Sequence, residues 1–157
     1  MERIKIYDIL HHDHLCQIEL TRVENSCLKT LFDQLENREI KVKFFACHQE
    51  KNGEPQLTFC VERSSFKTTQ KILSQLPLKD ENIHINPGVG MVAIYGPHFV
   101  ERPGIIDIMH NALSSRSVKV LAISTTLSSS FFVVPSTEVV RAVDILKQTF
   151  EIPMGKV

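Results

Sequence analysis

The chain repeats one order of structural elements, and this repeat constrains its fold more than any other feature. The segment LFDQLENREIKVKFFAC (31–47) corresponds to MHNALSSRSVKVLAIST (109–125), and Leu35 and Leu113 are 78 residues apart. Upstream, QIEL aligns with MVAI, and downstream TFCVERS aligns with SFFVVPS, at slightly smaller separations. Self-similarity of this kind indicates two copies of one small unit.

Each copy reads as a strand, a helix, two strands and a second helix. Alternating apolar residues predict the strands, apolar residues at helical spacing predict the helices, and Ser26, Ser64 and Ser136 are expected to be N-caps. The expected strands are 15–20, 40–47, 57–61, 82–85, 91–95, 118–123 and 131–134. Strands interrupted by two helices favour an α+β class with two ferredoxin-like (βαββαβ) domains. Each would be a four-stranded antiparallel sheet with its helices on one face.

The second copy has no obvious closing strand, because EIPMGKV is short and contains Pro153. The segment RIKIYDIL, which precedes the first copy, alternates in the manner of a strand. We predict that it completes the sheet of the second copy. The expected domains are therefore an inserted domain, 11–87, and a second domain made of 1–10 and 88–157. HHDHLC and Asn86-Pro87-Gly88 are expected to be connections between strands.

Composition narrows the class of protein. Lys plus Arg and Asp plus Glu both number 18, and the resulting formal charge of zero argues against a nucleic-acid or membrane-surface binder. It is compatible with a stable oligomer. A homodimer is expected, because a four-stranded sheet with helices on one face leaves its other face and two edges to be covered. The charged opening is unlike a signal peptide, and no apolar run approaches the roughly 18 residues of a spanning helix. A cytoplasmic protein with reduced cysteines is expected.

The loop that follows strand 91–95 is the best candidate for binding a small ligand. A helix start offers unpaired N–H groups and the positive end of the helix dipole. Pro103 is expected at the first helical position, and Gly104 would allow a ligand close to the backbone. Glu101 or Asp107 could recognise a basic side chain. The expected ligand-binding residues are His98, Phe99, Val100, Glu101, Arg102, Pro103, Gly104, Ile105, Ser124, Thr125 and Thr126. A plain strand-to-helix turn explains the same pattern, and both explanations stay open.

The matching loop of the first copy, TRVENSC, is shorter and lacks both Pro and Gly. Its weaker candidates are Arg22, Glu24, Asn25 and Ser26, with the N–H groups above Ser26 and the Arg22 guanidinium as carboxylate donors. A copy that has kept only a structural role fits the loop equally well.

Two further patterns contain residue types that occur in metal sites or at catalytic thiols. HHDHLC (11–16) contains metal-ligating residue types, but adjacent strand residues point to opposite faces, and no pair has zinc-site spacing. Cys27 would lie just inside a helix start, which can lower a thiol pKa, but the sequence suggests no histidine base for it. We therefore expect no metal, no cofactor and no catalysis, with a thiol- or metal-dependent enzyme as the least favoured alternative.

The stretch GPHFVERPGI followed by a helix, and the later VKVLAISTT, resemble the second ACT domain of aspartokinases. The N-terminal strand followed by an inserted first copy resembles their regulatory region. This resemblance implies paired ACT domains that bind an amino acid such as lysine or threonine and regulate a kinase domain. The chain lacks the Gly-rich phosphate loop and the Lys-x-Gly-Gly opening of that domain. The implied function is a non-catalytic amino-acid sensor. A degenerate pair that serves only as the regulatory subunit of a separate enzyme is the alternative.

Overall fold

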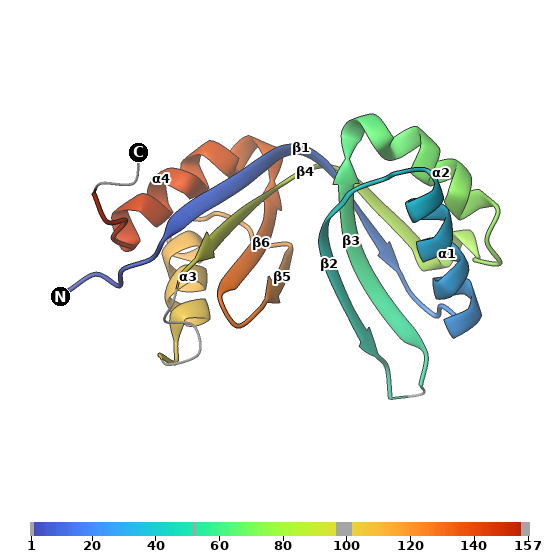
Figure 1. Cartoon of the computed structure of the whole chain (residues 1–157), viewed down its shortest axis with the longest axis horizontal. Helices are drawn as coiled ribbons and strands as arrows, with labels where there is room; N and C mark the ends of the chain where they lie inside the picture. The colour runs from blue at the N-terminus through green and yellow to red at the C-terminus, as the bar shows by residue number, and fades with distance from the viewer. Residues whose placement is uncertain (1, 52, 97–101, 155–157) are drawn as a thin grey trace. The chain divides into compact units, whose positions relative to one another are not determined.

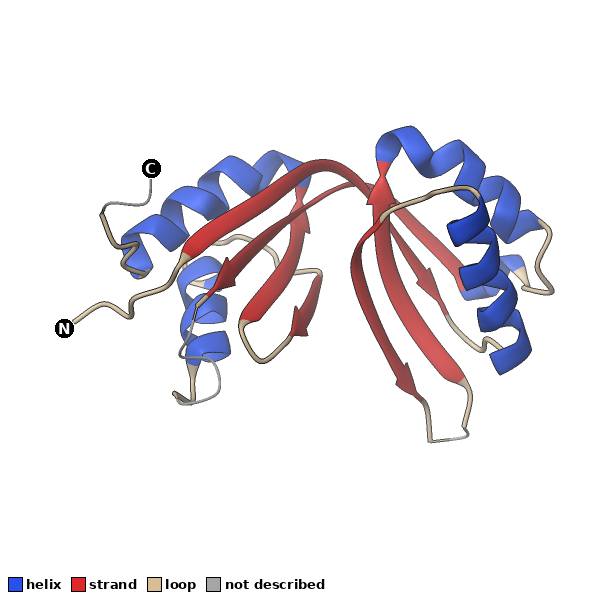
Figure 2. Cartoon of the chain, in the orientation of Figure 1, coloured by secondary structure: helices blue, strands red, loops and turns tan. Residues whose placement is uncertain are grey.

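The computed structural model describes residues 2–51, 53–96 and 102–154. The class is α+β, with antiparallel strands and, in the described part, four α-helices (Figures 1 and 2). The elements are β1 (Asp8–Leu20), α1 (Asn25–Asn37), β2 (Val42–Gln49), β3 (Pro55–Glu62), α2 (Phe66–Ser74), β4 (Ile83–Tyr95), α3 (Ile105–Ser114), β5 (Ala122–Thr125), β6 (Ser129–Pro135) and α4 (Val139–Thr149). Short 3-10 turns occupy Arg63–Ser65, Asp80–Asn82 and Ser136–Glu138.

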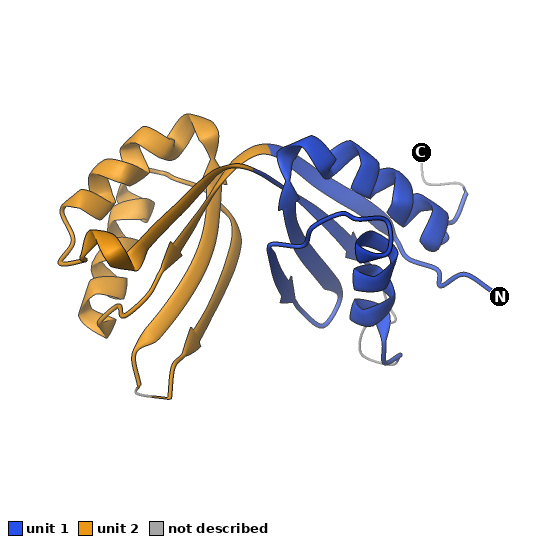
Figure 3. Cartoon of the chain, turned by 180° about the vertical axis from the view of Figure 1, so that it is seen from behind, with its two compact units in different colours: residues 1–13, 89–157 blue, residues 14–88 orange. Residues whose placement is uncertain are grey.

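The chain divides into two compact units (Figure 3). Unit 1 comprises Met1–Asp13 and Val89–Val157, and unit 2 comprises His14–Gly88. The strands follow the order β2-β3-β1-β4-β6-β5. Since β1 and β4 both run past the boundary between the units, unit 2 contains β2-β3-β1-β4 and unit 1 contains β1-β4-β6-β5.

The two connections expected from the sequence are wrong. HHDHLC lies within the continuous strand β1, and Asn86-Pro87-Gly88 lies within the continuous strand β4. The polar residues do not end β1, because His11 to His14 are exposed to solvent. Within unit 2, β4 is the outermost strand, and an outer strand tolerates a proline that donates no ladder hydrogen bond.

The core of unit 2 lies between its sheet and the helices α1 and α2. Ile18 and Phe59 contribute from neighbouring antiparallel strands, in direct register, and Leu31 and Ile72 contribute from the two helices. The helical stripes predicted around Leu31 and Ile72 are therefore confirmed. Phe32, predicted on the same stripe, is exposed, because it lies at the margin of α1 beside β2.

The core of unit 1 joins α3 and α4 to β4 and β6, with Met109, Phe132 and Leu146 fully buried. The N-terminal segment also belongs to it, because Ile4, Ile6 and Ile9 are buried there. Its backbone is fixed from two sides. The Tyr7 N–H donates to the Tyr95 carbonyl at 2.8 Å, and the Ile6 N–H donates to the Glu151 carbonyl at 2.9 Å.

Several element boundaries differ from those expected. Ser26, Ser64 and Ser136 are not N-caps: α1 begins at Asn25, and the other two serines belong to 3-10 turns that precede their helices. The expected strand 118–123 is shifted, because β5 begins at Ala122, while Val118 packs into the core of unit 1. Within the described residues, no helix combines the length and apolar character needed to cross a bilayer.

Candidate functional site

The start of α3 differs from its expected geometry in one respect. Gly104 is the N-cap, at φ 89, and the first helical residue is Ile105, so Pro103 precedes the cap and is not at the first helical position. The Ile108 N–H donates to the Gly104 carbonyl at 2.9 Å. A positive φ costs glycine less than any other residue, which explains the glycine at position 104.

The first turn of α3 opens onto a hollow of about 240 Å³. Its lining residues are Arg102, Pro103, Gly104, Ile105, Ile106 and Thr125. A side chain built on Gly104 would meet nothing within 4 Å, so the space beside its backbone is open. No side chain of the described residues caps α3.

The hydroxyls at the end of β5 have structural partners. The Thr125 hydroxyl lies 3.1 Å from the Ser129 carbonyl and 3.1 Å from the Ser130 hydroxyl. The Thr126 hydroxyl accepts the Ser129 N–H at 3.1 Å and lies 2.7 Å from the Ser129 hydroxyl. Thr126 thus fixes the β5–β6 hairpin, whereas Thr125 both supports the hairpin and lines the hollow.

The structure brings five of the eleven expected residues to one hollow. These are Arg102, Pro103, Gly104, Ile105 and Thr125. Ser124 is half-buried on β5, and Thr126 is exposed at the hairpin, outside the lining of this hollow. His98, Phe99, Val100 and Glu101 lie outside the described residues. Ile106 was missed by sequence reasoning, although it directly follows the expected Ile105.

The weaker candidates of the first copy are separated. Arg22 lines a hollow of about 470 Å³ together with Thr21, Glu50, Lys51, Glu54 and Gln56. Glu24, Asn25 and Ser26 are not part of that lining, because they begin α1. The hairpin residues were missed, because only the pairing of β1 with β3 places the end of β1 beside the start of β3, and no local sequence pattern gives that pairing.

Three of the four cysteines have a raised thiol pKa. Burial raises the pKa of Cys27, and the nearby negative charge of Glu24 raises that pKa further, so the position of Cys27 near the start of α1 does not lower it. Burial raises the pKa of Cys60 to about 12, with a smaller contribution from Cys16. Burial also raises the pKa of Cys16, against the opposing effect of Arg63. Among the described residues, no three His, Cys, Asp or Glu side chains are grouped to hold a metal ion.

Comparisons with known proteins agree with the resemblance seen in the sequence. Residues 84–148 match the family model of the ACT domain. An aspartokinase of Bacillus sp. (strain MGA3) is 22% identical over 155 residues, which is 96% of this chain but 38% of that protein. The chain thus spans well under half of the length of that relative.

Two solved structures show the same fold. The regulatory subunit of aspartate kinase from Thermus thermophilus superimposes with a TM-score of 0.78 at 18% identity, covering 93% of this chain and 99% of that one. Aspartate kinase from Synechocystis gives a TM-score of 0.83 at 19% identity, covering 96% of this chain and 28% of that one. At these identities, the likeness establishes the fold.

Proposed function

Because the chain contains an ACT domain and resembles the regulatory region of aspartokinases, we propose that it is a non-catalytic amino-acid-sensing module. Its two units are a tandem pair of ferredoxin-like ACT domains, with the first copy inserted into the second. The strand orders of the two units support this proposal, as does the pairing of Tyr7 with Tyr95, which puts the N-terminal segment beside β4. We further propose a cytoplasmic location, in keeping with four free cysteines.

The observation that carries the sensing function is the hollow at the start of α3. The N–H groups of the first turn, the positive end of the helix dipole and the Arg102 side chain all favour a carboxylate at one place. Ile105 and Ile106 would contact the aliphatic part of the ligand. The β5 backbone near Thr125 offers carbonyl oxygens to an ammonium group, and Asp107 in the first turn could pair with a basic side chain.

Replacing Arg102 by glutamine tests the proposal. We expect the wild-type protein to bind at least one free amino acid, lysine or threonine among them, in isothermal titration against the twenty. For that ligand, Arg102→Gln should weaken binding by about tenfold or more, because a charge-assisted hydrogen bond to the carboxylate is lost.

Arg3→Gln is the matched control. Arg3 also belongs to unit 1, but its guanidinium lies near the Lys147 and Gln148 carbonyls at the end of α4. Silence against all twenty amino acids would instead favour the degenerate pair that only regulates a separate enzyme.

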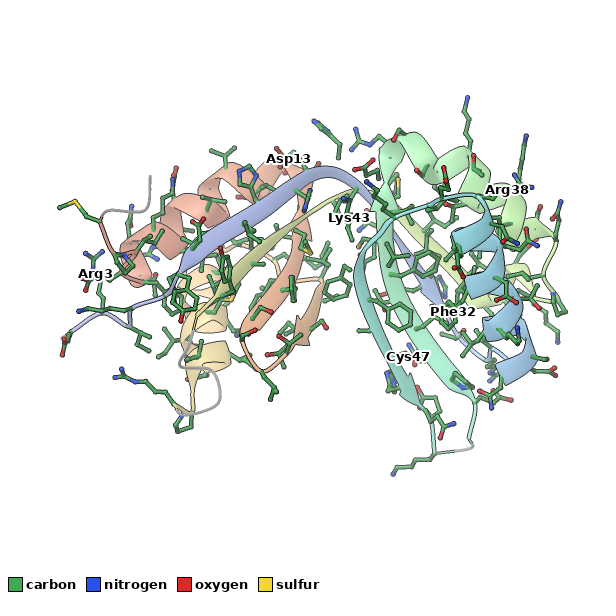
Figure 4. The ribbon with its side chains drawn as sticks, in the orientation of Figure 1. Arg3, Asp13, Phe32, Arg38, Lys43 and Cys47 are labelled. Carbon is green, nitrogen blue, oxygen red and sulfur yellow. The ribbon has the colours of Figure 1, made fainter. Side chains whose placement is uncertain are left out.

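We propose a homodimer formed at the edge of unit 2. Strand β2 pairs with β3 alone among the described strands, so its other backbone edge faces outward. Beside this edge, Phe32 on α1 (Figure 4) and Phe45 on β2 are 42% and 41% exposed, with ring centroids 5.6 Å apart. Together with Leu35, Val42 and Phe59, they line an apolar hollow of about 330 Å³. Antiparallel pairing of β2 with the same strand of a second copy would cover this surface.

Phe45→Asp should turn the dimer into a monomer in sedimentation velocity. A carboxylate in a desolvated apolar contact is strongly unfavourable, whereas it is solvated in the free chain. Val140→Asp is the control, because Val140 is an exposed apolar residue on α4, in unit 1. A Phe45→Asp protein with the same sedimentation coefficient as the wild type would exclude this edge as the interface.

A further inference from the structure

We infer that unit 2 docks an extended peptide of a partner protein along the outer edge of β4, and that this peptide carries apolar side chains and a lysine or arginine. The edge lies beside a hollow of about 290 Å³ between α2 and the start of β4. The lining residues are Gln70, Leu73, Ser74, Asp80, Ile83 and Ile85. None of them lines the hollow at α3 or the proposed dimer surface, so the inference goes beyond the proposed function.

The outer edge of β4 has no strand partner within unit 2, in the part of the chain that the structure describes. Strand β1 lies on one side of β4, and β6 pairs with the other side only from Val89 to Tyr95. Next to that pairing, Pro87 has no N–H group, and its carbonyl accepts a hydrogen bond from Arg63 Nη2 at 3.3 Å. The segment 83–86 therefore offers a short edge to which a strand can be added.

The start of β4 is held in place, so that its outward backbone groups are already oriented. The Thr21 N–H donates to the Asn82 carbonyl at 3.0 Å, and the Thr21 hydroxyl donates to Asn82 Oδ1 at 3.1 Å. Because the Asn82 carbonyl points toward β1 and successive residues of a strand alternate in direction, the N–H and C=O groups of Ile83 and Ile85 point away from β1. An added strand would meet a donor and an acceptor at each of these two residues.

The side chains along this edge form an apolar surface for the added strand. Ile83 and Ile85 are two residues apart, so they face the same side of the sheet, and both line the hollow together with Leu73 of α2. Leu73 is buried and Ile83 packs at the margin of the core, whereas Ile85 is 37% exposed. A strand whose alternate side chains are apolar would cover Ile85 and extend this surface.

The charge of the hollow indicates the chemistry of the partner. Asp80 lines the hollow, Glu81 follows it in the 3-10 turn that precedes β4, and no basic side chain is part of the lining. Among the described residues, neither carboxylate takes part in an ion pair, whereas Asp33 and Glu138 each have a basic partner on their own helix or turn. A lysine or arginine of the peptide would complement these two carboxylates, and an acidic residue would be repelled.

The test is an NMR titration of the ¹⁵N-labelled full chain with the peptide acetyl-Thr-Val-Thr-Val-Thr-Lys-amide. Antiparallel pairing puts its valines opposite Ile85 and Ile83 and its lysine beside Glu81. We expect the amide resonances of Ile83, His84 and Ile85 to shift at submillimolar peptide. Methylation of the amide nitrogen of the second valine should require about tenfold more peptide, because the hydrogen bond to the Ile83 carbonyl is lost. Glutamate in place of the lysine should require about fivefold more, since an exposed ion pair contributes little.

Asp80→Asn should reduce the preference for the lysine peptide over the glutamate peptide without affecting the fold, because Asp80 is exposed. Glu36→Gln is the matched control, since Glu36 is an exposed acid on α1 of the same unit and does not line the hollow. This control should keep the full preference for lysine.

Four results would overturn the inference. The first is an absence of shifts at millimolar peptide, and the second is equal binding of the N-methylated peptide or an unchanged preference in Asp80→Asn. The third is shifts confined to β2, which would assign the peptide to the edge proposed for the homodimer. The fourth is a dependence of the Ile83 and Ile85 resonances on protein concentration without peptide, which would assign the edge of β4 to a second copy of the chain.

Discussion

Gly90→Ala is expected to destabilise the protein by about 3 kcal/mol, at the upper end of the usual cost of overpacking. A Cβ atom on Gly90 would lie 2.4 Å from Val139 Cγ2 and 2.8 Å from the His12 carbonyl oxygen. The valine is fully buried at the start of α4, and the carbonyl belongs to the neighbouring strand, so neither can move aside without shifting backbone. Urea denaturation followed by circular dichroism measures the free energy of unfolding.

Gly88→Ala is the matched control, because Gly88 lies two residues away on the same strand, and a Cβ atom added there would meet nothing within 4 Å. We expect this variant to stay within about 0.5 kcal/mol of the wild type. Equal stability of the two variants would show that α4 does not pack on β4 as closely as the Gly90 distances imply. If Gly90→Ala does not fold, its near-ultraviolet circular dichroism should be lost, whereas that of Gly88→Ala should be retained. This contrast gives the same result qualitatively.

Phe59→Ala should cost about 4 kcal/mol, because it removes a large side chain from the core of unit 2. Phe59 is 1% exposed and packs among Ile18, Leu31 and other residues of its cluster. Phe32→Ala, which removes the same atoms from a side chain that is 42% exposed, should cost about 1 kcal/mol. The midpoints and slopes of urea denaturation distinguish the two variants, measured at a protein concentration low enough for both to be monomers, because Phe32 also belongs to the proposed dimer surface. Equal costs would contradict the burial of Phe59 in the core of unit 2 and the exposure of Phe32 at its margin.

The sequence was most informative where burial and periodicity coincide. Leu31, Ile72, Met109 and Leu146 lie on helical stripes, and a helix on a sheet must bury one stripe. It was least informative about where strands stop. Polar and turn-favouring residues such as His11 and Pro87 are normally read as loops, but they are tolerated in a strand where their side chains face solvent and one backbone edge is unpaired. That exposure depends on strand order, which a local pattern does not contain.

The candidate site was predictable only in part, for a related reason. Gly104 and Thr125 could be named because a glycine before a helix and hydroxyls at a strand end have local signatures. Glu50 and Gln56 could not, because they reach Arg22 only through the antiparallel register of β1 and β3. Contacts across strands depend on register, and register is set by the whole sheet.

Because β1 and β4 run through both units, a cut at either unit boundary divides both strands, and unit 1 is made of two separate pieces of chain. A fragment limited to 84–148, the part that matches the ACT model, would lack the N-terminal segment that supplies Ile4, Ile6 and Ile9 to its core. Likewise, an insertion of one residue near His12 would turn the side chains of β1 that follow it to the opposite face of the sheet. A truncation or a loop graft in this chain must therefore keep both β1 and β4 whole, because each strand belongs to both units.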